Sequence, residues 1–383
     1  MNPRYPSRIY ELFSREAQNA FLSQAAHQCA SLRGHEHVVE AMRHWQVPFV
    51  PTDHWEARER QTQHDIAAWV SLVRESLATP EARDQFHSGL TSSDLVDTAL
   101  SMALQKATRQ ISRARANALL AVCQFADDAR SLSIRGRTHG QDAEYVSIGR
   151  RVAAQAYRLS QVPLEWYPMD KSSGPVGIDG RLGETQVSNR GRLVDPMGDL
   201  VALSLAIEQL ALDVRLMARA PERLVYTLPS AGQMGSSSMP DKVNPIIAEK
   251  LCGLARVIRA NARAVQDSTV LWEERDISHS SVERTAMVEA YALTDYCLQQ
   301  LEKLFSTLKA NPDLPAIEVT AVQAYDTLVE HGGLTREQAY REVQVWGPAV
   351  ALHKVGVAEH VRLIGYDPDS EPHLWEWVRK RAR

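Results

Sequence analysis

The chain has 383 residues, of which 44% are hydrophobic and 23% are charged, as in an ordinary globular protein with a large core. This length suffices for two or three domains. The formal net charge of −4 excludes a general attraction to nucleic acid or to an anionic membrane surface, so we expect neither as a partner.

Targeting features and cysteine spacing point to the cytoplasm. The first residues carry Arg and Glu and lack the apolar core of a signal peptide, and no apolar run approaches the ~18 residues of a membrane span. Four cysteines stand far apart and form no CxxC pair, which argues against a disulfide framework and against a thiolate metal site. We therefore expect free thiols in a cytoplasmic protein.

Proline and glycine divide an otherwise helical chain into three regions. Breaks fall near Pro48, near Gly174, between Leu228 and Pro245, and near Pro312. Because β-branched residues seldom alternate with polar ones, strands should be scarce and the fold class should be all-α. We expect an N-terminal helical domain, a central long-helix bundle that carries the catalytic segments, and a small C-terminal helical domain, which span residues 1–87, 88–305 and 306–383.

The central region contains three long helical segments. The first, from Asp97 to Ala126, contains almost no Gly or Pro. In the second, from Asp199 to Ala220, apolar residues alternate at spacings of three and four, and a similar stripe follows Pro245. The seam of the second segment consists of Leu200, Leu203, Ile207, Leu210, Val214 and Met217. Such seams pack helix on helix, and we expect this one to join subunits of a homo-oligomer.

Hydroxyl side chains precede the first long helix, in the segment from His87 to Ala99. Thr91, Ser92 and Ser93 stand just before the expected helix start. Serine and aspartate at such a place cap free backbone N–H groups, which is the structural interpretation. Both roles are compatible, because one hydroxyl can cap the helix while its neighbours face the carboxylate of a ligand.

His139 lies between Thr138 and Gly140, where a backbone can approach closely. A lone histidine is most often a hydrogen-bonded structural residue, and these residues alone favour that interpretation. Only the family resemblance described below favours a catalytic role.

A polar loop from Gly232 to Pro245 precedes another long helix. It contains two glycines and three successive serines, which disfavour a helix interior. Lys242 and Asn244 stand just before Pro245, at a position that suits the first turn of the next helix. A lysine, an amide and free backbone N–H groups at a helix start form a receptor for a carboxylate. Gly and Ser alone would favour a flexible surface linker.

Two cations and a hydroxyl gather between Trp272 and Arg284, namely Arg275, Ser280 and Arg284. A solvated face with salt bridges is the simpler interpretation. A phosphate pocket is the alternative, because paired guanidinium groups suit the oxygens of a phosphate.

The ending of the serine-rich loop resembles the signature of the fumarase/aspartase superfamily. The pattern Gly-Ser-Ser-x-Met-Pro-x-Lys-x-Asn-Pro is matched by Gly235, Ser236, Ser237, Met239, Pro240, Lys242, Asn244 and Pro245. Within that superfamily, the sequence Gly-Leu-Thr-Ser-Ser-Asp, which ends at Asp94, resembles the corresponding segment of the adenylosuccinate lyases. Further similar segments are Arg4-Tyr5, Gln63-His64-Asp65, Gly136 to Ala143, and Thr185-Gln186 with Arg190 and Arg192. The resemblance extends from Arg4 to about Arg341.

The resemblance implies a three-region all-α fold and a lyase that splits a succinyl adduct by β-elimination and releases fumarate. It assigns Ser236 as the base and His139 as the acid that protonates the leaving nitrogen. No metal and no cofactor are implied, because fixed donors take the role of a Lewis acid. The implied substrate is a small nucleotide.

The resemblance also implies a substrate-binding set. Thr91, Ser92, Lys242 and Asn244 hold the succinyl carboxylates. Gln186 orients the substrate near the departing nitrogen, and His64 hydrogen-bonds the substrate or supports its phosphate. The phosphate residues are Arg4, Tyr5, Arg275, Ser280 and Arg284, and Asp65 and Ser237 complete the set. Members of the family form homotetramers whose sites combine the Thr-His segment of one chain with the Ser loop of another.

Several departures from the family pattern, a short tail among them, concern the substrate. Only seven residues separate Gly177 from Thr185, and Tyr145, Met234 and Asp241 replace the residues usual at their positions. A fumarate-releasing lyase that acts on a different succinyl adduct, in specialised or phage nucleotide metabolism, is therefore a second interpretation. A catalytically inactive homologue is a third, and the retention of His139, Ser236, Lys242 and Asn244 argues against it.

Overall fold

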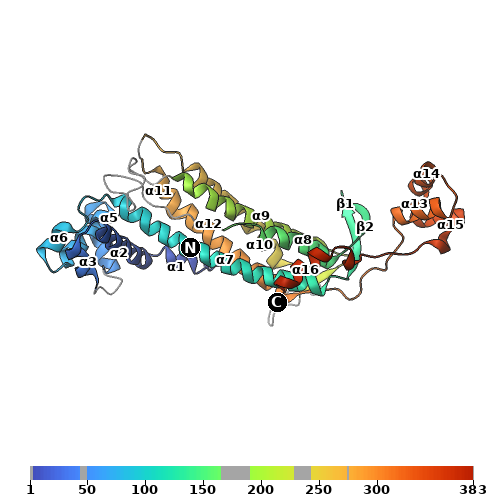
Figure 1. The fold of residues 1–383 in the computed structure, drawn as a ribbon, viewed down its shortest axis with the longest axis horizontal. Helices are drawn as coiled ribbons and strands as arrows, with labels where there is room; N and C mark the ends of the chain where they lie inside the picture. Colours follow the sequence, from blue (N-terminus) through green and yellow to red (C-terminus); the bar gives the residue numbers. More distant parts are fainter. Residues whose placement is uncertain (1–2, 44–49, 165–189, 228–242, 274–275, 383) are drawn as a thin grey trace. The chain divides into compact units, whose positions relative to one another are not determined.

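The computed structural model of the chain describes residues 3–43, 50–164, 190–227, 243–273 and 276–382 (Figure 1). The residues of interest that lie outside these ranges are Gln186, Met234, Ser236, Ser237, Asp241, Lys242 and Arg275. None of the helices in the described ranges combines the length and the hydropathy needed to span a membrane.

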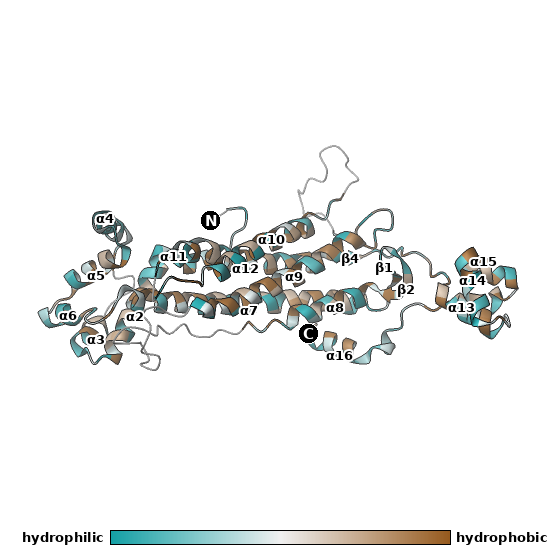
Figure 2. Cartoon of the chain, turned by 90° about the horizontal axis from the view of Figure 1, so that it is seen from above, coloured by the Kyte–Doolittle hydropathy of each residue, from teal (hydrophilic) through white to brown (hydrophobic). Residues whose placement is uncertain are grey.

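The chain divides into two compact units. The first comprises Met1–Arg115, Val162–Leu205 and Gly253–Gln299, and the second comprises Ala116–Gln161, Ala206–Cys252 and Gln300–Arg383. Four long helices contribute to both units, and their segments run side by side within each (Figures 1 and 2). They are α7 (Ser92–Asp128), α9 (Val194–Met217), α10 (Ile246–Asp267) and α12 (Val288–Thr307). The fold is thus all-α, as expected, and the three-region division stays a prediction.

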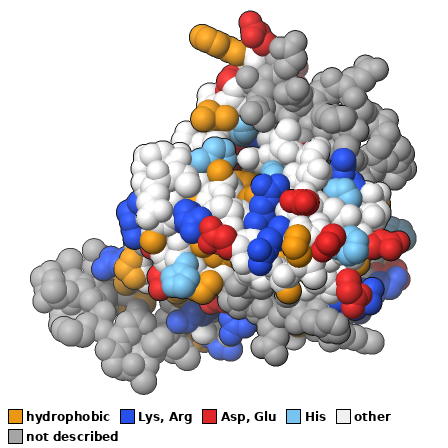
Figure 3. Space-filling view, turned by 90° about the vertical axis from the view of Figure 1, so that its left-hand side faces the viewer, with side chains coloured by type: hydrophobic (Ala, Val, Ile, Leu, Met, Phe, Trp, Pro, Cys, Tyr) orange, Lys and Arg blue, Asp and Glu red, His pale blue; other side chains and the backbone are white. Residues whose placement is uncertain are grey.

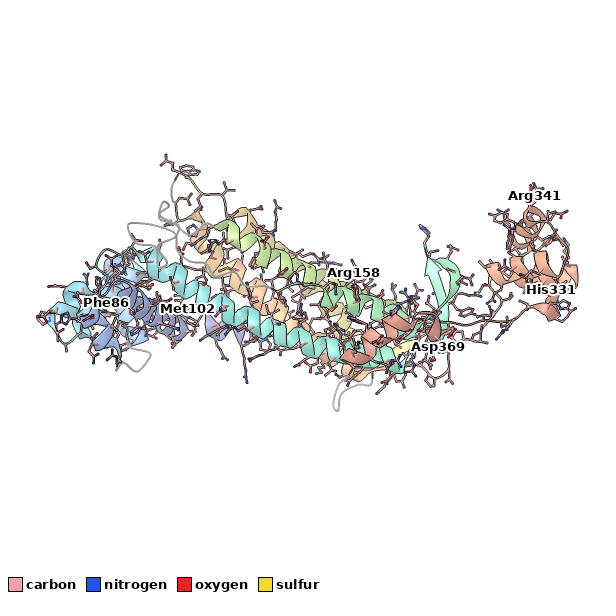
Figure 4. All side chains as sticks on the ribbon, in the orientation of Figure 1. Phe86, Met102, Arg158, His331, Arg341 and Asp369 are labelled. Atoms are coloured by element: carbon pink, nitrogen blue, oxygen red, sulfur yellow. The ribbon has the colours of Figure 1, made fainter. Side chains whose placement is uncertain are left out.

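The first unit begins with short helices that pack against the start of α7. They are α1 (Ile9–Leu12), α2 (Arg15–Leu32), α3 (Glu36–Arg43), α4 (Thr52–Thr62), α5 (Asp65–Ser76) and α6 (Pro80–Gln85). Their core is rich in aromatic residues: Trp69 and Phe86 pack with ring centroids 6.0 Å apart, and Trp55 is fully buried beside them. Figure 4 labels Phe86 and, on α7, Met102. Figure 3 shows acidic and basic side chains interspersed on the face over these helices.

Helix α9 is apolar around most of its circumference, as its colouring in Figure 2 indicates. The six residues of the expected seam are each 1% exposed or less within a single chain. The expectation that this seam joins subunits is therefore wrong, because the seam packs inside the chain's own core. The apolar residues that α9 leaves exposed form a different stripe: Val194, Leu205, Leu212 and Leu216.

The second unit contains the few strands of the described ranges. A hairpin of β1 (Ser133–Thr138) and β2 (Gln141–Ser147) leads into α8 (Ile148–Ser160), and β3 (Val225–Thr227) pairs with β4 (Leu308–Ala310). A C-terminal module follows, with α13 (Ala321–Glu330), α14 (Arg336–Trp346) and α15 (Pro348–Val355) around its own small core. Figure 4 labels His331 and Arg341 in this module, and α16 (Pro372–Arg381) ends the chain.

Candidate active site

His139 stands at the tip of the β1–β2 hairpin. Thr138 pairs with Gln141, so the loop consists of two residues, His139 and Gly140, with φ values of 53° and 77°. Two successive residues with positive φ are typical of the tight hairpin turn that matches the twist of the strands, and glycine adopts this conformation without strain. The turn leaves His139 exposed to solvent. An open hollow of about 480 Å³ next to Gly140 is lined by Arg137, Asp142, Arg219 and Glu222 among others.

Side chains of the hairpin fasten it to the segment that precedes α13. The Tyr145 hydroxyl accepts the backbone N–H of Glu318 at 2.6 Å. The hydroxyl of Thr320 donates to Glu144 at 2.9 Å. At the base of the hairpin, the Ser133 hydroxyl accepts the N–H of Tyr366 at 3.0 Å, where the chain leaves the C-terminal module. The strands that carry His139 are therefore held on both connections of this module.

His64 caps α5 in the first unit. Its Nδ1 accepts the N–H of Ala67 at 3.2 Å, so the neutral ring carries its proton on Nε2 and can donate it to a ligand. The neighbouring Asp65 turns toward another element, because its Oδ2 accepts from Arg284 at 2.6 Å. These contacts place the His64-Asp65 turn beside Arg284.

Ser280 and Arg284 lie where α11 (Ser278–Val282) continues through a π-helical turn, Glu283–Met287, into α12. Such turns occur often at functional sites, because they displace side chains from the regular helical rows. Asp276 holds the start of α11 by accepting from the hydroxyl and the backbone N–H of Ser278. The hydroxyl hydrogen bond of Ser278 and two backbone hydrogen bonds lower the pKa of Asp276 to about 2.

A cavity of about 140 Å³ lies within the first unit, beside these residues. One side is apolar and includes Phe13, Phe21 and Trp55, and the polar lining consists of Gln18, Asp65, Ser280, Glu283 and Arg284. The cavity therefore has an apolar side and a charged side, on which two carboxylates and one guanidinium lie. Within the described ranges, no cluster of three His, Cys, Asp or Glu side chains is arranged to hold a metal ion.

A buried ion triad also lies in the first unit. Arg190, in the 3₁₀ turn Arg190–Leu193, donates from Nη2 to Asp97 at 2.8 Å, and its Nε lies 2.7 Å from Oε1 of Glu283. Arg190 is 3% exposed, Asp97 1% and Glu283 7%. In the sequence, Arg190 stands out only as a match to the family, and no pattern marks Asp97 or Glu283. Asp97 and Glu283 each lie 93 residues from Arg190 in the sequence. No local sequence pattern therefore indicates that the three side chains pair.

Thr91 and Ser92 lie at the start of α7. The backbone N–H of Thr91 donates to Asp94 at 2.6 Å, and the Thr91 hydroxyl lies 3.3 Å from the same carboxylate oxygen. Thr91 precedes the helix as expected, whereas Ser92 is its first residue. Asp94 therefore accepts a backbone N–H at the helix start, while the capping by a hydroxyl and the role of both hydroxyls toward a ligand stay predictions.

Tyr5 packs on the long helix well beyond Arg284. The Tyr5 ring packs on Tyr296 with centroids 5.5 Å apart. Tyr296 lies twelve residues beyond Arg284 on the same continuous helix, which corresponds to ~18 Å. Within one chain Tyr5 therefore lies away from Arg284, and a phosphate site that combines Arg4 and Tyr5 with Arg284 stays a prediction.

Asn244 lies in the second unit, two residues before α10, and its carbonyl accepts the N–H of Ile246 at 2.9 Å. Lys242 and the serine loop lie outside the described ranges, so their part in a carboxylate receptor stays a prediction.

Solved structures of lyase and cycloisomerase type have the same fold. A fumarate lyase from Mesorhizobium sp. BNC1 superposes with a TM-score of 0.73 at 20% identity, covering 98% of this chain and 93% of that one. The 3-carboxy-cis,cis-muconate lactonizing enzyme of Pseudomonas putida gives a TM-score of 0.75 at 18% identity, covering 99% and 97%. The chain therefore shares the fold of these enzymes.

Sequence comparison places the chain more narrowly. A family model described as "Lyase" matches residues 14–162 and 182–260. The chain is 32% identical to the adenylosuccinate lyase of Bacillus subtilis over 340 residues, which covers 79% of this chain and 78% of that protein. It is 33% identical to the adenylosuccinate lyase of Streptococcus mutans, covering 82% and 79%, and 33% identical to that of Synechocystis sp., covering 75% and 73%. The chain belongs to the adenylosuccinate lyase family.

Proposed function

We propose that this protein cleaves adenylosuccinate into AMP and fumarate by β-elimination, as a C–N lyase of purine nucleotide metabolism. One observation carries the proposal: the chain is more than 30% identical to several adenylosuccinate lyases over about three quarters or more of both chains. The names of these relatives favour adenylosuccinate over a different succinyl adduct.

The reaction breaks a C–N bond and a C–H bond next to a carboxylate. Removing that proton places charge on an aci-carboxylate, so the site needs a base, an acid for the leaving nitrogen and fixed donors for the developing charge. Ser236 takes the proton, the electron pair of the C–H bond forms the double bond of fumarate, and His139 protonates the departing nitrogen. The exposed hairpin tip supports this role of His139, because an acid must be accessible to the leaving group.

The nucleotide end of the substrate binds to the first unit. Arg284 keeps most of its side chain exposed while one nitrogen pairs with Asp65, so its other N–H groups remain directed to a phosphate. Ser280 and Nε2 of His64 supply further donors beside it. Thr91, Ser92, Gln186, Ser237, Lys242 and Asn244 bind the succinyl end and the purine.

The protein acts as a homotetramer with shared sites in the cytoplasm. The exposed apolar stripe of α9 supports an assembly, because a helix that is apolar all round is normally covered on every side. The separation of Tyr5 from Arg284 within one chain supports sites shared between copies. The four cysteines are buried and form no disulfide, which suits a reducing compartment.

The test is an assay of the pure protein with adenylosuccinate, in which absorbance and fumarate are followed together. Equal amounts of AMP and fumarate are expected, and the variants His139→Ala and Ser236→Ala should be inactive although folded. Fumarate release from another N-succinyl compound but not from adenylosuccinate would retain the reaction type and reject the substrate. No fumarate from either compound would reject the function.

A further inference from the structure

The buried triad of Asp97, Arg190 and Glu283 joins three segments that are distant in the sequence. Asp97 lies in the second turn of α7, five residues after Ser92. Glu283 immediately precedes Arg284 and begins the π-helical turn. Arg190 stands four residues after Gln186 and is the first described residue after the gap at 165–189. Each segment thus carries residues that the proposed function assigns to substrate binding.

The geometry is that of a guanidinium fork held by two carboxylates. Nη2 of Arg190 donates to Oδ1 of Asp97 at 2.8 Å and lies 3.4 Å from Oε2 of Glu283, while Nε faces Oε1 of Glu283 at 2.7 Å. Nη2 is thus the donor to both carboxylates, and the close approach of Nε to Glu283 is an ion-pair contact without the alignment of a hydrogen bond. A planar guanidinium can present these two nitrogens along one edge. A lysine ammonium in the same place would be a single point charge.

Stability alone does not explain such a triad. When both carboxylates are ionised, they leave an excess negative charge around one buried cation, and buried ion groups of this kind are often replaceable by apolar residues without loss of stability. Nη1 of Arg190 and Oδ2 of Asp97, moreover, have no hydrogen-bond partner among the residues that the structure describes. The triad therefore fixes the positions of the segments that carry Asp97, Arg190 and Glu283 relative to one another. An apolar contact at the same place would allow these segments to slide past each other.

We infer that Arg190 is a positioning residue, which holds the first turns of α7 and the Ser280–Arg284 turn in register for binding of the phosphorylated substrate. It acts through Asp97 and Glu283 and does not itself touch the substrate. The inference rests on the proposed function, because the residues that it positions are those of the nucleotide site.

The principal test is the variant Arg190→Lys, which retains the charge and loses the fork. The value of kcat/KM for adenylosuccinate should fall about tenfold or more. The ratio of kcat/KM between adenylosuccinate and dephosphorylated succinyladenosine should also fall, because a displaced Arg284 no longer recognises the phosphate. A merely structural role would lower both kcat/KM values by the same factor and leave this ratio unchanged.

Arg58→Lys is the matched control. Arg58 also pairs with one carboxylate through both terminal nitrogens, at 2.7 and 3.1 Å from Glu75, on helices α4 and α5. This variant should change every kcat/KM value by less than about twofold. The milder variant Glu283→Gln keeps Arg190 paired with Asp97. The ratio of kcat/KM for adenylosuccinate to kcat/KM for succinyladenosine, here called the discrimination ratio, should therefore fall less than it does in Arg190→Lys.

Hydrogen exchange of the backbone amides gives a readout that is independent of turnover. In Arg190→Lys, exchange should accelerate in residues 92–98 and 280–287 together and remain unchanged in α5 and in α13–α15. An unchanged discrimination ratio, or exchange that accelerates throughout the first unit, would overturn the inference. A wild-type protein that is inactive on adenylosuccinate would reject the proposed function instead, and the exchange pattern would still decide whether Arg190 couples the two segments.

Discussion

Glu283 is the residue of the triad whose ionisation is most strongly affected by its surroundings. Burial raises its pKa to about 7, although the charge of Arg190 opposes this effect. Asp97 adds to the increase, and Arg284, the other charged group that acts on Glu283, lowers the pKa. The carboxyl group therefore changes its charge near neutral pH, beside the guanidinium assigned to the phosphate.

We predict that Glu283→Gln changes how stability depends on pH. Between the ordinary pKa of Glu and about 7, the folded protein retains a proton that the unfolded chain has lost, so wild-type stability falls as the pH rises through this window. Glutamine cannot titrate, and the variant should therefore gain stability relative to wild type toward alkaline pH, by at most about 3 kcal/mol.

Melting temperatures measured at about pH 5 and about pH 8.5 provide the test. The two proteins should melt at similar temperatures at the acidic pH and diverge at the alkaline pH, with the variant the more stable. A constant difference at both values would mean that Glu283 keeps an ordinary pKa.

At the scale of elements, the hairpin that carries the proposed acid His139 depends on its two-residue turn. Gly140 has φ of 77° and nothing within 4 Å of the position of a Cβ atom, so alanine would fit in space but strain the backbone. We predict that Gly140→Ala lowers kcat clearly with little change in KM, because strain of about 1–2 kcal/mol is relieved by moving the neighbouring His139.

Gly34→Ala is the control, since Gly34 has φ of 69° and equally open surroundings in the loop between α2 and α3. Steady-state kinetics and melting temperatures of both variants are compared. Similar losses of stability with a fall in kcat only for Gly140→Ala are expected. Unchanged kcat in Gly140→Ala would show that the contribution of His139 to catalysis does not depend on the geometry of its turn.

Periodicity predicted the long helices well and the hairpin not at all. The stretch from Asp97 to Ala126 lies within α7, and the segment from Asp199 to Ala220 corresponds to α9, which begins five residues earlier and ends three residues earlier. Apolar spacing is a local property, so it can be read from one segment. The hairpin has polar strands and a His-Gly turn, which lack the usual hairpin signals of alternating hydrophobic residues and Asn-Gly.

The candidate site was predictable only where a motif is contiguous. Neighbouring residues such as His64 and Asp65 were found together, and the structure adds that Arg284 joins them. The pairing of Asp97, Arg190 and Glu283 depends on how distant segments pack, which the sequence does not encode locally. The apolar seam of α9 was correctly predicted to be buried, but we expected it to pack against another subunit and it packs inside the chain's own core. Periodicity shows that a helix face is buried and does not show which element covers it.

At the scale of the whole molecule, the stripe that α9 exposes should hold the assembly together. We predict that Leu212→Glu combined with Leu216→Glu shifts the protein to smaller species and abolishes activity, because charges in a packed apolar interface are costly. Light scattering and the fumarate assay are measured on the same samples. Leu32→Glu, on an exposed leucine at the end of α2, should leave both unchanged.

An intact oligomer in the double variant would show that α9 does not form the interface.

Shared sites predict complementation between inactive proteins. His139→Ala and Ser236→Ala, mixed, gently dissociated and reassociated, should give roughly a quarter of whole sites if each site takes His139 from one chain and Ser236 from another. The recovered rate measures this fraction. Without recovery, in samples where light scattering confirms mixed oligomers, both residues come from the same chain.

The fastening of the hairpin to the C-terminal module constrains how the chain can evolve. Ser133, Glu144 and Tyr145 hold the two connections through which the module leaves and rejoins the rest of the second unit. Descendants that lengthen or trim the module's helices can do so freely, since these helices have a core of their own. Changes in the length of either connection would instead displace the strands that carry His139, the proposed proton donor. We therefore expect natural variation in this family branch to accumulate inside the module and to spare its two attachment points.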